Sequence, residues 1–527
     1  MLEFASPMGF AMQAVNYYCY VAIVPLPLGD ESIEDRMSRH QDTMHQVLPQ
    51  LGDLWENQWL PGMMPGLDAP RARDYSSLSD SELLGTLKSM REEFTDRYTV
   101  HGKINFVIVS ASMYADLYNE LFTPEDPTEP YETLQGFPTR SLAAGRGLWK
   151  LSRQIRSSNA LSQVFNESDV SEIVPRLEQT DDGRAFLTDF RAYLEEFGWR
   201  SDVFEFADPT WREDPTIPLN TLQGYIRLGD DSDPDARHAE TVDRKDQLLE
   251  RARERLAGDP ETLGKFNALY DMARPYLELT ENHNFYIDQI GNGVMRLPVL
   301  EIGCRLAERG TVPRSEDVFM LYIEELGAAL GGQDFNSTVA QRRSELEHWA
   351  QIIPVPAIGE PPEHSDDPMS AGFEKMFGAP PEPSRDPDVL QGIGASAGGV
   401  QGTVKVVKNL SEGSKLRQGD IMVCEMTMPP WTPLFATVSA VVADTGGVLS
   451  HCAIVSREYR MPCVVGTQVG TALLQDGMKI TVDGSTGIVR IDSRWFTGAG
   501  SRVCTFYGAR PSSLDKHVTV RTMPLSV

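Results

Sequence analysis

The stretch DTGGVLSHCAIVSREYRMPCVVG, residues 444–466, contains the clearest passage from strand to helix in the chain. The run just before it, VSAVVAD, has the short, β-branched composition of a buried strand. The pair Gly446–Gly447 then permits a tight turn, and Ser450 is a favoured N-cap residue. His451 is therefore predicted in the first turn of a helix that packs on a sheet through Ala453–Val455.

A helix start of this kind is a suitable seat for a phosphate-like anion. Its first N–H groups have no partner within the helix, and they carry a partial positive charge. A neutral imidazole at His451 could accept a phosphoryl group as a nucleophile, with the helix end and Arg457 meeting the developing charge. A histidine at a helix start can equally be a packed structural side chain. The sequence around His451 is therefore needed to choose between a nucleophile and a structural residue.

The chain after residue 388 has the pattern of a compact α/β domain. Period-two alternation and frequent glycines predict six short strands, within 398–409, 419–426, 438–444, 463–467, 478–484 and 487–492. Helices are few: a prominent one at about 450–459 and a short one near 470–475. We therefore predict one β-rich domain over residues 389–495, followed by a tail over 496–527.

The chain before this domain follows the helical period from about residue 30 to 350. Ser79 and Glu82 have the spacing of a capping box, and Gly258 and Gly310 are predicted helix ends. Residues 353–388 hold nine of the 35 prolines, which disfavours both helix and sheet and predicts an exposed hinge. The expected fold is multidomain: a large, mostly α-helical domain at 1–352, a linker at 353–388 and the α/β domain.

Composition limits the classes of partner. Of the net charge of −28, the first 387 residues carry −31, because residues 388–495 are neutral and the last 32 carry +3. Such an acidic surface disfavours nucleic acid and anionic membranes, although it can also serve solubility alone. The first basic residue is Arg36, and no run of about 20 apolar residues occurs. With six scattered cysteines, these features predict a cytoplasmic protein without a disulfide framework.

Taken together, the segments GDIMVCEMTMPPWTPLF, TGGVLSHCAIVSREYRMPCVVG and DGMKITVDGSTGIVRI resemble the swivelling phosphohistidine domain of the phosphoenolpyruvate-utilising enzymes, over about residues 390–492. That family includes phosphoenolpyruvate synthase, pyruvate phosphate dikinase, rifampicin phosphotransferase and phenylphosphate synthase. The resemblance implies that His451 is transiently phosphorylated and that Gly446, Gly447 and Ser450 shape its pocket. Leu449 stands where many members have threonine, and Ser450 is expected to supply the missing hydroxyl.

Residues 281–326 resemble the helical segment that precedes the linker in rifampicin phosphotransferase and in phenylphosphate-synthase-like proteins. This likeness implies that the α domain binds the acceptor substrate. His283 and His101 are candidate bases for the acceptor hydroxyl, and Arg296 is a candidate for neutralising the transferring phosphoryl group. Apolar walls for an aromatic acceptor are expected from the N-terminal run, namely Phe4, Met8, Phe10, Met12, Tyr17 and Tyr18.

Residues 1–350 show no Gly-rich phosphate loop of an ATP-grasp domain, so a split enzyme is expected. An ATP-grasp-type partner subunit would bind ATP with Mg²⁺ or Mn²⁺, and no metal ligands are predicted in this chain. By resemblance to the two-subunit phenylphosphate synthase, used in phenol degradation, ATP would give AMP, phosphate and a phosphorylated small phenol through phospho-His451. Two alternatives stay open: an antibiotic or other bulky alcohol as acceptor, and a phosphocarrier or adaptor protein with no small-molecule acceptor site.

Overall fold

The computed structural model describes residues 8–25, 29–202, 206–352, 358, 368–378 and 384–493. The chain forms two compact units. The first comprises Met1–Val47, Ile302–His364 and Trp495–Val527, and the second comprises Leu48–Glu301 and Ser365–Arg494. The predicted tail at 496–527 and most of the predicted linker lie outside the described residues.

In the first unit, a β-hairpin is formed by β1 (Met8–Val15) and β2 (Tyr18–Pro25), which pair antiparallel. Asn16 and Tyr17 form its turn with positive φ angles of 53° and 68°, as a two-residue hairpin turn requires. The Tyr18 hydroxyl lies 2.5 Å from the carbonyl oxygens of Trp349 and Ile352. The hairpin was not predicted, because its turn lacks the glycine that usually marks one. The other elements of this unit are α1 (Ile33–Val47), η5 (Ser315–Met320), α16 (Leu326–Leu330) and α17 (Asn336–Trp349).

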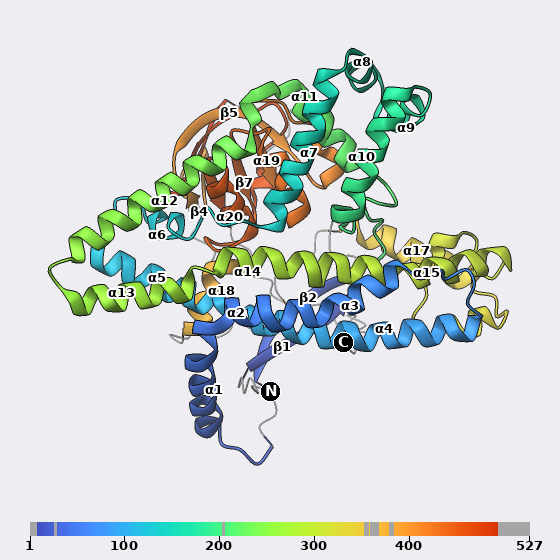
Figure 1. Cartoon of the computed structure of the whole chain (residues 1–527), viewed down its shortest axis with the longest axis horizontal. Helices are drawn as coiled ribbons and strands as arrows, with labels where there is room; N and C mark the ends of the chain where they lie inside the picture. The colour runs from blue at the N-terminus through green and yellow to red at the C-terminus, as the bar shows by residue number, and fades with distance from the viewer. Residues whose placement is uncertain are drawn as a thin grey trace. The chain divides into compact units, whose positions relative to one another are not determined.

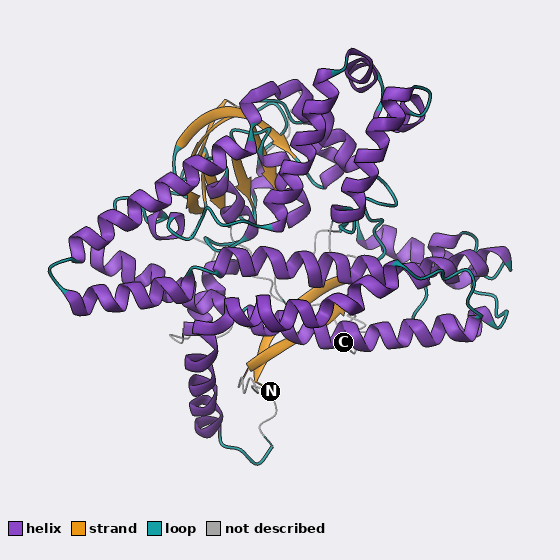
Figure 2. Cartoon of the chain, in the orientation of Figure 1, coloured by secondary structure: helices purple, strands orange, loops and turns teal. Residues whose placement is uncertain are grey.

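The second unit contains the helical scaffold of the candidate site (Figures 1 and 2). Its helices are η1 (Leu48–Gln50), α2 (Leu51–Leu54), η2 (Trp55–Trp59), α3 (Leu60–Arg71), α4 (Asp80–Ile104), α5 (Val107–Phe122), α6 (Glu129–Glu132), α7 (Arg140–Ser157), α8 (Asn159–Glu167), α9 (Val170–Leu177), α10 (Asp181–Phe197), α11 (Thr216–Leu228), η3 (Gly229–Ser232), α12 (Pro234–Leu256), α13 (Pro260–Ala273), α14 (Tyr276–His283), η4 (Asn284–Ile290) and α15 (Gly291–Glu308), the last running on into the first unit.

The predicted helix signals are confirmed where they can be compared. Ser79 caps α4 in a reciprocal capping box with Glu82. Helix α12 ends two residues before Gly258, and α15 ends two residues before Gly310, which has a φ of 71°. The mostly helical character of this part of the chain is thus correct.

The α/β domain contains one sheet of eight strands in the order β3-β10-β9-β5-β6-β7-β8-β4. Strands β5 (Gly399–Val406), β6 (Asp420–Cys424), β7 (Ala440–Ala443) and β8 (Cys463–Val465) are parallel, whereas β9 (Lys479–Asp483) and β10 (Ile488–Ser493) form an antiparallel pair. Its core of Val, Ile, Leu and Ala side chains includes Val404, Ile421, Val442, Val464 and Ile480. The six predicted strands are all present.

Two edge strands were not predicted. They are β3 (Val389–Gln391), which pairs with β10, and β4 (Ile393–Ser396), which pairs with β8. Each is only three or four residues long, which gives too few residues for a strand pattern, and β4 (IGAS) also contains Gly and Ala, which are depleted in strands. Because Gly392 alone separates β3 from β4, both ends of the strand order are brought close together.

The segment predicted to lack regular structure contains helix α18 (Pro368–Phe377). The expectation of no helix between 353 and 388 is therefore wrong at these ten residues. After Pro368, which fits the first turn of a helix, the run MSAGFEKMF has no proline and can form the backbone hydrogen bonds. Helix α18 contacts α5, where the Lys375 ammonium lies 2.6 Å from a carboxylate oxygen of Asp116.

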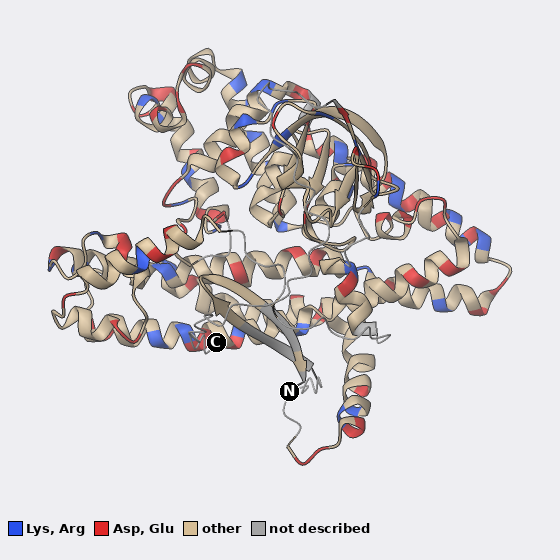
Figure 3. Ribbon diagram, turned by 180° about the vertical axis from the view of Figure 1, so that it is seen from behind, with Lys and Arg blue, Asp and Glu red and all other residues tan. Residues whose placement is uncertain are grey.

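Shorter helices of this chain are the 3₁₀ turns η6 (Leu410–Lys415) and η7 (Pro429–Trp431), and α19 (Thr432–Phe435), α20 (His451–Glu458) and α21 (Gly470–Leu473). Acidic and basic positions are both scattered along the helices, while the large sheet is mostly uncharged (Figure 3). Among the described residues, no helix combines the length and the apolar character that crossing a membrane requires.

Close packing at the turn between β9 and β10 leads to a stability prediction. A Cβ atom on Gly484 would collide with the Ser396 carbonyl oxygen and would lie 2.7 Å from the Cys463 backbone nitrogen. On Gly399 the nearest atom to such a Cβ would be 3.8 Å away, which is ordinary contact. We expect Gly484→Ala to lower the free energy of unfolding by about 1–3 kcal/mol, and Gly399→Ala to change it much less, in urea unfolding. Equal effects would contradict this account of the turn.

Candidate functional site

His451 occupies the predicted position at the start of α20. Ser450 precedes it with extended backbone angles, and the Ser450 hydroxyl accepts a hydrogen bond from the Ala453 N–H, so the predicted N-cap is confirmed. The helix follows β7 through a loop whose first residue, Asp444, accepts hydrogen bonds from Thr467 and from the backbone N–H of Gly470. These bonds anchor the base of the loop, and His451 lies at its end.

Two threonine hydroxyls hold the His451 ring. Thr427 Oγ1 lies 3.0 Å from Nδ1, and Thr432 Oγ1 lies 3.3 Å from Nε2. The Thr432 hydroxyl also donates to the Pro429 carbonyl oxygen, so its single proton is already used. The Phe435 ring meets the imidazole edge-on with the ring centroids 6.3 Å apart. All of these contacts come from the stretch TMPPWTPLF after β6, which carried the family resemblance but was given no residue roles.

The imidazole of His451 is held in its neutral form. Burial lowers its pKa from 6.5 to about 3; a hydrogen bond with Thr427 opposes this shift, and the positive charge of Arg200 adds to it. A neutral imidazole keeps a lone pair on one ring nitrogen, which is what a nucleophile needs. The side chain remains partly exposed, so a reacting group can still reach it.

Arg200, which sequence reasoning missed, is the second component of the site. It lies in the loop after α10, is only 1% exposed, and none of its three guanidinium nitrogens has a hydrogen-bond partner among the described residues. Its guanidinium carbon lies 5.2 Å from the Trp211 ring centroid and 5.3 Å from that of Phe285. Burial lowers its pKa to about 10, so it stays charged at neutral pH.

A buried charge without a hydrogen-bond partner is costly, because burial removes water and no hydrogen-bond acceptor replaces it. A guanidinium presents five N–H donors in a planar fork that suits phosphate oxygens. Arg200 therefore has the properties of an oxyanion-binding side chain near His451. In the sequence, the one sign of this role is an arginine with aromatic residues nearby. That pattern is common in proteins and is therefore weak evidence for an anion site.

Glu281 adds an unusual carboxyl group close to Arg200. Burial raises its pKa to about 7; a hydrogen bond from Ser141 and the charge of Arg200 lower it, and Glu458 raises it. The Ser141 hydroxyl donates to Glu281 over 2.5 Å. A carboxyl group with a pKa near neutrality can accept a proton from a reacting hydroxyl. Glu281 is the first residue of the segment 281–326 that carried a family resemblance, but the sequence analysis did not propose it as a base.

Gly446 and Gly447 lie against helix α18 in this structure. A Cβ atom on Gly447 would collide with the Lys375 carbonyl oxygen, and the Gly447 N–H donates to the Met376 carbonyl oxygen over 2.9 Å. Gly446 has a φ of 100°, which side chains rarely adopt. In this structure the backbone of helix α18 occupies the space beside Gly447 that a side chain would fill.

Leu449 is explained by packing. It is 1% exposed, its N–H donates to the Lys375 carbonyl oxygen, and its own carbonyl oxygen accepts a hydrogen bond from the Tyr276 hydroxyl over 2.6 Å. The residue thus joins the loop before His451 to α14 and α18. A leucine side chain suits this dry position, where the hydroxyl of a threonine would need its own partner.

The two predicted arginines are not brought to His451 by any contact among the described residues. Arg457 is buried and donates to the Ala395 carbonyl oxygen over 2.7 Å, below the ring of Tyr131. Arg296 donates to Glu213 over 2.7 and 2.9 Å and to the Phe206 carbonyl oxygen. Arg296 is thus held by Glu213, whereas Arg457 uses one guanidinium nitrogen for the Ala395 carbonyl oxygen and has no hydrogen-bond partner for the other two among the described residues.

His101 and His283, the candidate bases, are brought together. Their ring centroids are 4.6 Å apart, and Asp288 lies beside them. In the part of the chain that the structure describes, no hydrogen bond or ring contact joins either one to His451. The predicted aromatic wall has a mixed outcome: Phe4 and the side chains of Met8, Phe10 and Met12 lie outside the described residues, whereas Tyr17 and Tyr18 bond to α17 and the segment after it.

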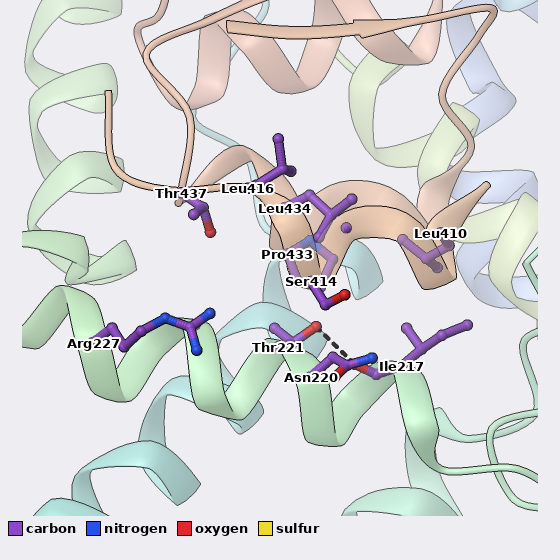
Figure 4. A pocket seen from close by; sticks show the side chains of 12 residues that line it. Ile217, Asn220, Thr221, Arg227, Leu410, Ser414, Leu416, Pro433, Leu434 and Thr437 are labelled. Carbon is purple, nitrogen blue, oxygen red and sulfur yellow. Dashed lines mark hydrogen bonds between the residues drawn. The ribbon is translucent and has the colours of Figure 1, made fainter. Parts of the chain in front are cut away.

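Two hollows border the domain that carries His451. A cavity of about 20 Å³ lies between α11 and the η6 and α19 turns, with Thr221 and Arg227 on one side and Leu434 and Thr437 on the other (Figure 4). It is large enough for about one water molecule and too small for an acceptor. A groove of about 700 Å³, lined by Arg237, Tyr459 and Arg460 among others, has the size of a small-molecule site.

The site is built by two regions that each match a known family. Residues 416–487 match the PEP-utilising enzyme mobile domain, and residues 103–281 match the rifampicin phosphotransferase fourth domain. Residues 416–487 are thus similar to the mobile domain of the phosphoenolpyruvate-utilising enzymes, as the resemblance indicated. The sequence analysis expected the likeness to rifampicin phosphotransferase at residues 281–326. The match to its fourth domain instead covers residues 103–281. His451 belongs to the first region, and Arg200 and Glu281 belong to the second.

Individual relatives point to the same family. The chain is 32% identical to the uncharacterized phosphotransferase YvkC of Bacillus subtilis, over 84% of this chain and 52% of that protein. It is 24% identical to a rifampicin phosphotransferase of Streptomyces sviceus, over 80% and 48% of the two chains. Chondramide synthase cmdD of Chondromyces crocatus is 30% identical over 93% of this chain but only 13% of its own length. The chain spans at most about half the length of these relatives.

The low pKa of His451 predicts a pH dependence of stability. Its folded-state pKa of about 3 lies below the unfolded value of 6.5, so between these values the unfolded chain binds more protons. His451 therefore contributes stability above pH 6.5 that is lost as the pH falls toward 3. We expect wild-type stability to decrease between pH 8 and pH 5 by about 2 kcal/mol more than that of His451→Asn, in urea unfolding. If the stabilities of the wild type and of His451→Asn changed equally with pH, His451 would not have the low pKa described here.

Proposed function

We propose that this chain is the phosphohistidine-bearing part of an ATP-dependent phosphotransferase, which passes a phosphoryl group through His451 to the hydroxyl of a small phenol. One observation carries the proposal. A neutral imidazole at His451 lies near the unpartnered, buried guanidinium of Arg200, and the two side chains come from the two family-matched regions. A phosphoryl group on His451 would supply the anion that Arg200 lacks.

The first half-reaction consumes ATP and water and yields AMP, phosphate and phospho-His451. The ring lone pair of His451 forms the N–P bond to the β-phosphorus, and the bond from that phosphorus to the AMP oxygen breaks. Water then removes the terminal phosphate. In this step the chain's own contribution is the orientation of the imidazole by Thr427 and Thr432 and the suppression of its protonation.

In the second half-reaction the phenol oxygen attacks the phosphorus of phospho-His451. The N–P bond breaks, its electron pair returns to the ring nitrogen, and Arg200 donates hydrogen bonds to the phosphoryl oxygens. We assign Glu281 as acceptor of the phenol proton, because its pKa of about 7 lets it bind and release a proton near neutrality. The roles predicted for His101 and His283 as bases remain predictions.

The surroundings of His451 and Arg200 support an aromatic acceptor. Phe435 contacts the imidazole and also Tyr459, which lines the groove of about 700 Å³. Two aromatic side chains thus connect the groove with the histidine. Flat apolar walls with a few polar groups suit a phenol ring. A bulkier hydroxylated antibiotic is the second candidate acceptor, supported by the rifampicin phosphotransferases among the relatives.

For the donor, we propose an ATP-grasp-type partner subunit that binds ATP with Mg²⁺ or Mn²⁺. The proposed hinge at 353–388 would let His451 move between the donor and the acceptor region. In the arrangement seen here the mobile domain contacts the helical part, because Glu458 of α20 accepts a hydrogen bond from the Gly136 N–H over 2.7 Å. We assign this arrangement to the acceptor-facing half of the cycle.

Phosphoryl labelling tests the role of His451. The full chain is mixed with a candidate ATP-binding partner, Mg²⁺ and β-labelled ATP. We expect acid-labile label on the wild-type chain and on His348→Ala, an exposed histidine, but none on His451→Ala. Label on His451→Ala at the wild-type level would show that another residue is the nucleophile.

The role of Arg200 is tested in the transfer to phenol. We expect Arg200→Met to lower the rate of transfer from phospho-His451 by about 10²-fold or more, because one oxyanion donor group is lost. Arg200→Lys keeps the positive charge but lacks the planar guanidinium, so we expect its transfer rate to lie between those of the wild type and Arg200→Met. Single-turnover transfer from the labelled chain measures this step, and circular dichroism checks folding. A wild-type transfer rate in Arg200→Met would remove this residue from the site.

A further inference from the structure

The steps proposed for phosphoryl transfer use none of His101, His283 and Asp288, which form a cluster of their own. His101 comes from the last turn of α4, His283 ends α14, and Asp288 lies in the π-helical segment η4. One ligand atom from each residue lies within 4.8 Å of the others. Within the ranges that the structure describes, this is the one group of three or more His, Cys, Asp or Glu residues with such spacing.

The first argument for a ligand is the protonation of His283. This side chain is 3% exposed, and its Nδ1 lies 2.6 Å from the Leu279 carbonyl oxygen, to which it can only donate. The proton is therefore on Nδ1, and the lone pair is on Nε2. Histidines that bind metals commonly have this arrangement, in which a backbone carbonyl fixes the tautomer and the ring orientation.

The second argument is the contact between His101 and Asp288. His101 Nδ1 lies 3.2 Å from an Asp288 carboxylate oxygen, so an imidazole nitrogen and a carboxylate oxygen face each other in a mostly buried position. Two ligands at about 2.0–2.1 Å from one tetrahedral ion are separated by about 3.3 Å. The observed separation of 3.2 Å is close to this value, so the two atoms stand where two ligands of one ion would stand.

The third argument is the support behind Asp288. The Asn284 amide donates to an Asp288 carboxylate oxygen over 3.2 Å, and the Gln289 amide donates to Asn284 over 2.8 Å. Such a chain of side-chain hydrogen bonds orients a carboxylate that is only 5% exposed. The π-helical turn matters as well, because its i→i+5 hydrogen bonding brings residues five apart, such as His283 and Asp288, toward one side.

We propose that His101, His283 and Asp288 bind one divalent transition-metal ion of the Zn²⁺ class, with the remaining coordination position open to water. Two imidazole nitrogens and one carboxylate oxygen form a donor set that suits Zn²⁺, Co²⁺ or Fe²⁺. Mg²⁺ takes oxygen ligands almost exclusively, so the Mg²⁺ expected with ATP does not fit this cluster. The site joins α4 to the α14–η4 segment, which also carries Glu281 and Phe285 toward Arg200.

Metal titration of the chain alone tests this site without ATP, a partner or activity, so its result is independent of the proposed function. The purified full chain is stripped with a chelator, dialysed and titrated with Zn²⁺ and with Co²⁺ by calorimetry and by visible absorption of Co²⁺. We expect one ion per chain, and no saturable binding of Mg²⁺ at this site. His283→Gln, His101→Gln and Asp288→Asn should each abolish the stoichiometric binding.

Two further variants keep the test decisive if a buried ligand variant fails to fold. Asn284→Ala leaves all three ligands and removes a support, so we expect it to weaken binding by about 10- to 100-fold. His348→Gln changes an exposed histidine and should bind like wild type. The proposal is overturned if the stripped wild type takes up no stoichiometric Zn²⁺ or Co²⁺, or if folded Asn284→Ala and Asp288→Asn both bind as tightly as wild type.

Discussion

The constraint that organises this site is a buried positive charge without a hydrogen-bond partner among the described residues. Arg200 is enclosed by the rings of Phe197, Trp211 and Phe285, and its guanidinium has no hydrogen-bond acceptor among the described residues. Its charge adds to the effect of burial in keeping His451 neutral. The same charge helps Glu281 to ionise against the cost of burial. The charge of Arg200 thus favours the neutral form of His451, which a nucleophile needs, and the ionised form of Glu281, which a base needs.

Such an arrangement is expensive to fold and is sustained by the packing around it. The mobile domain contacts the helical part at several points: Leu449 bonds to Tyr276, Glu458 to Gly136, and the Leu410 N–H to Asp202. Helix α18 adds a support, since its Lys375 reaches Asp116 on α5 while its last carbonyl groups bond to the loop before His451. The glycine pair before His451 is therefore required for close backbone approach in this arrangement. If the domain swivels, these are the contacts that must be released.

Sequence reasoning was strongest for local features. The alternation of apolar residues located six of the eight strands of the α/β sheet, and Ser450 and Ser79 located helix starts, because caps and strand patterns involve residues close in the chain. It failed for β3 and β4, which are held by pairing with β10 and β8 far along the chain, and for the hairpin, whose turn lacks glycine. It also failed for α18, where a high proline count over 36 residues concealed a proline-free run.

What the sequence by itself determined is the strand–turn–helix unit that carries His451, together with the family that this unit resembles. A strand, a glycine turn and a capped helix are short-range features, so their residues suffice to specify them. Only the tertiary structure decided which side chains surround the histidine. Arg200 and Glu281 lie 251 and 170 positions before His451, and His101 meets His283 across two helices. Their roles depend on burial, missing partners and distances, which arise when distant segments pack and exclude water.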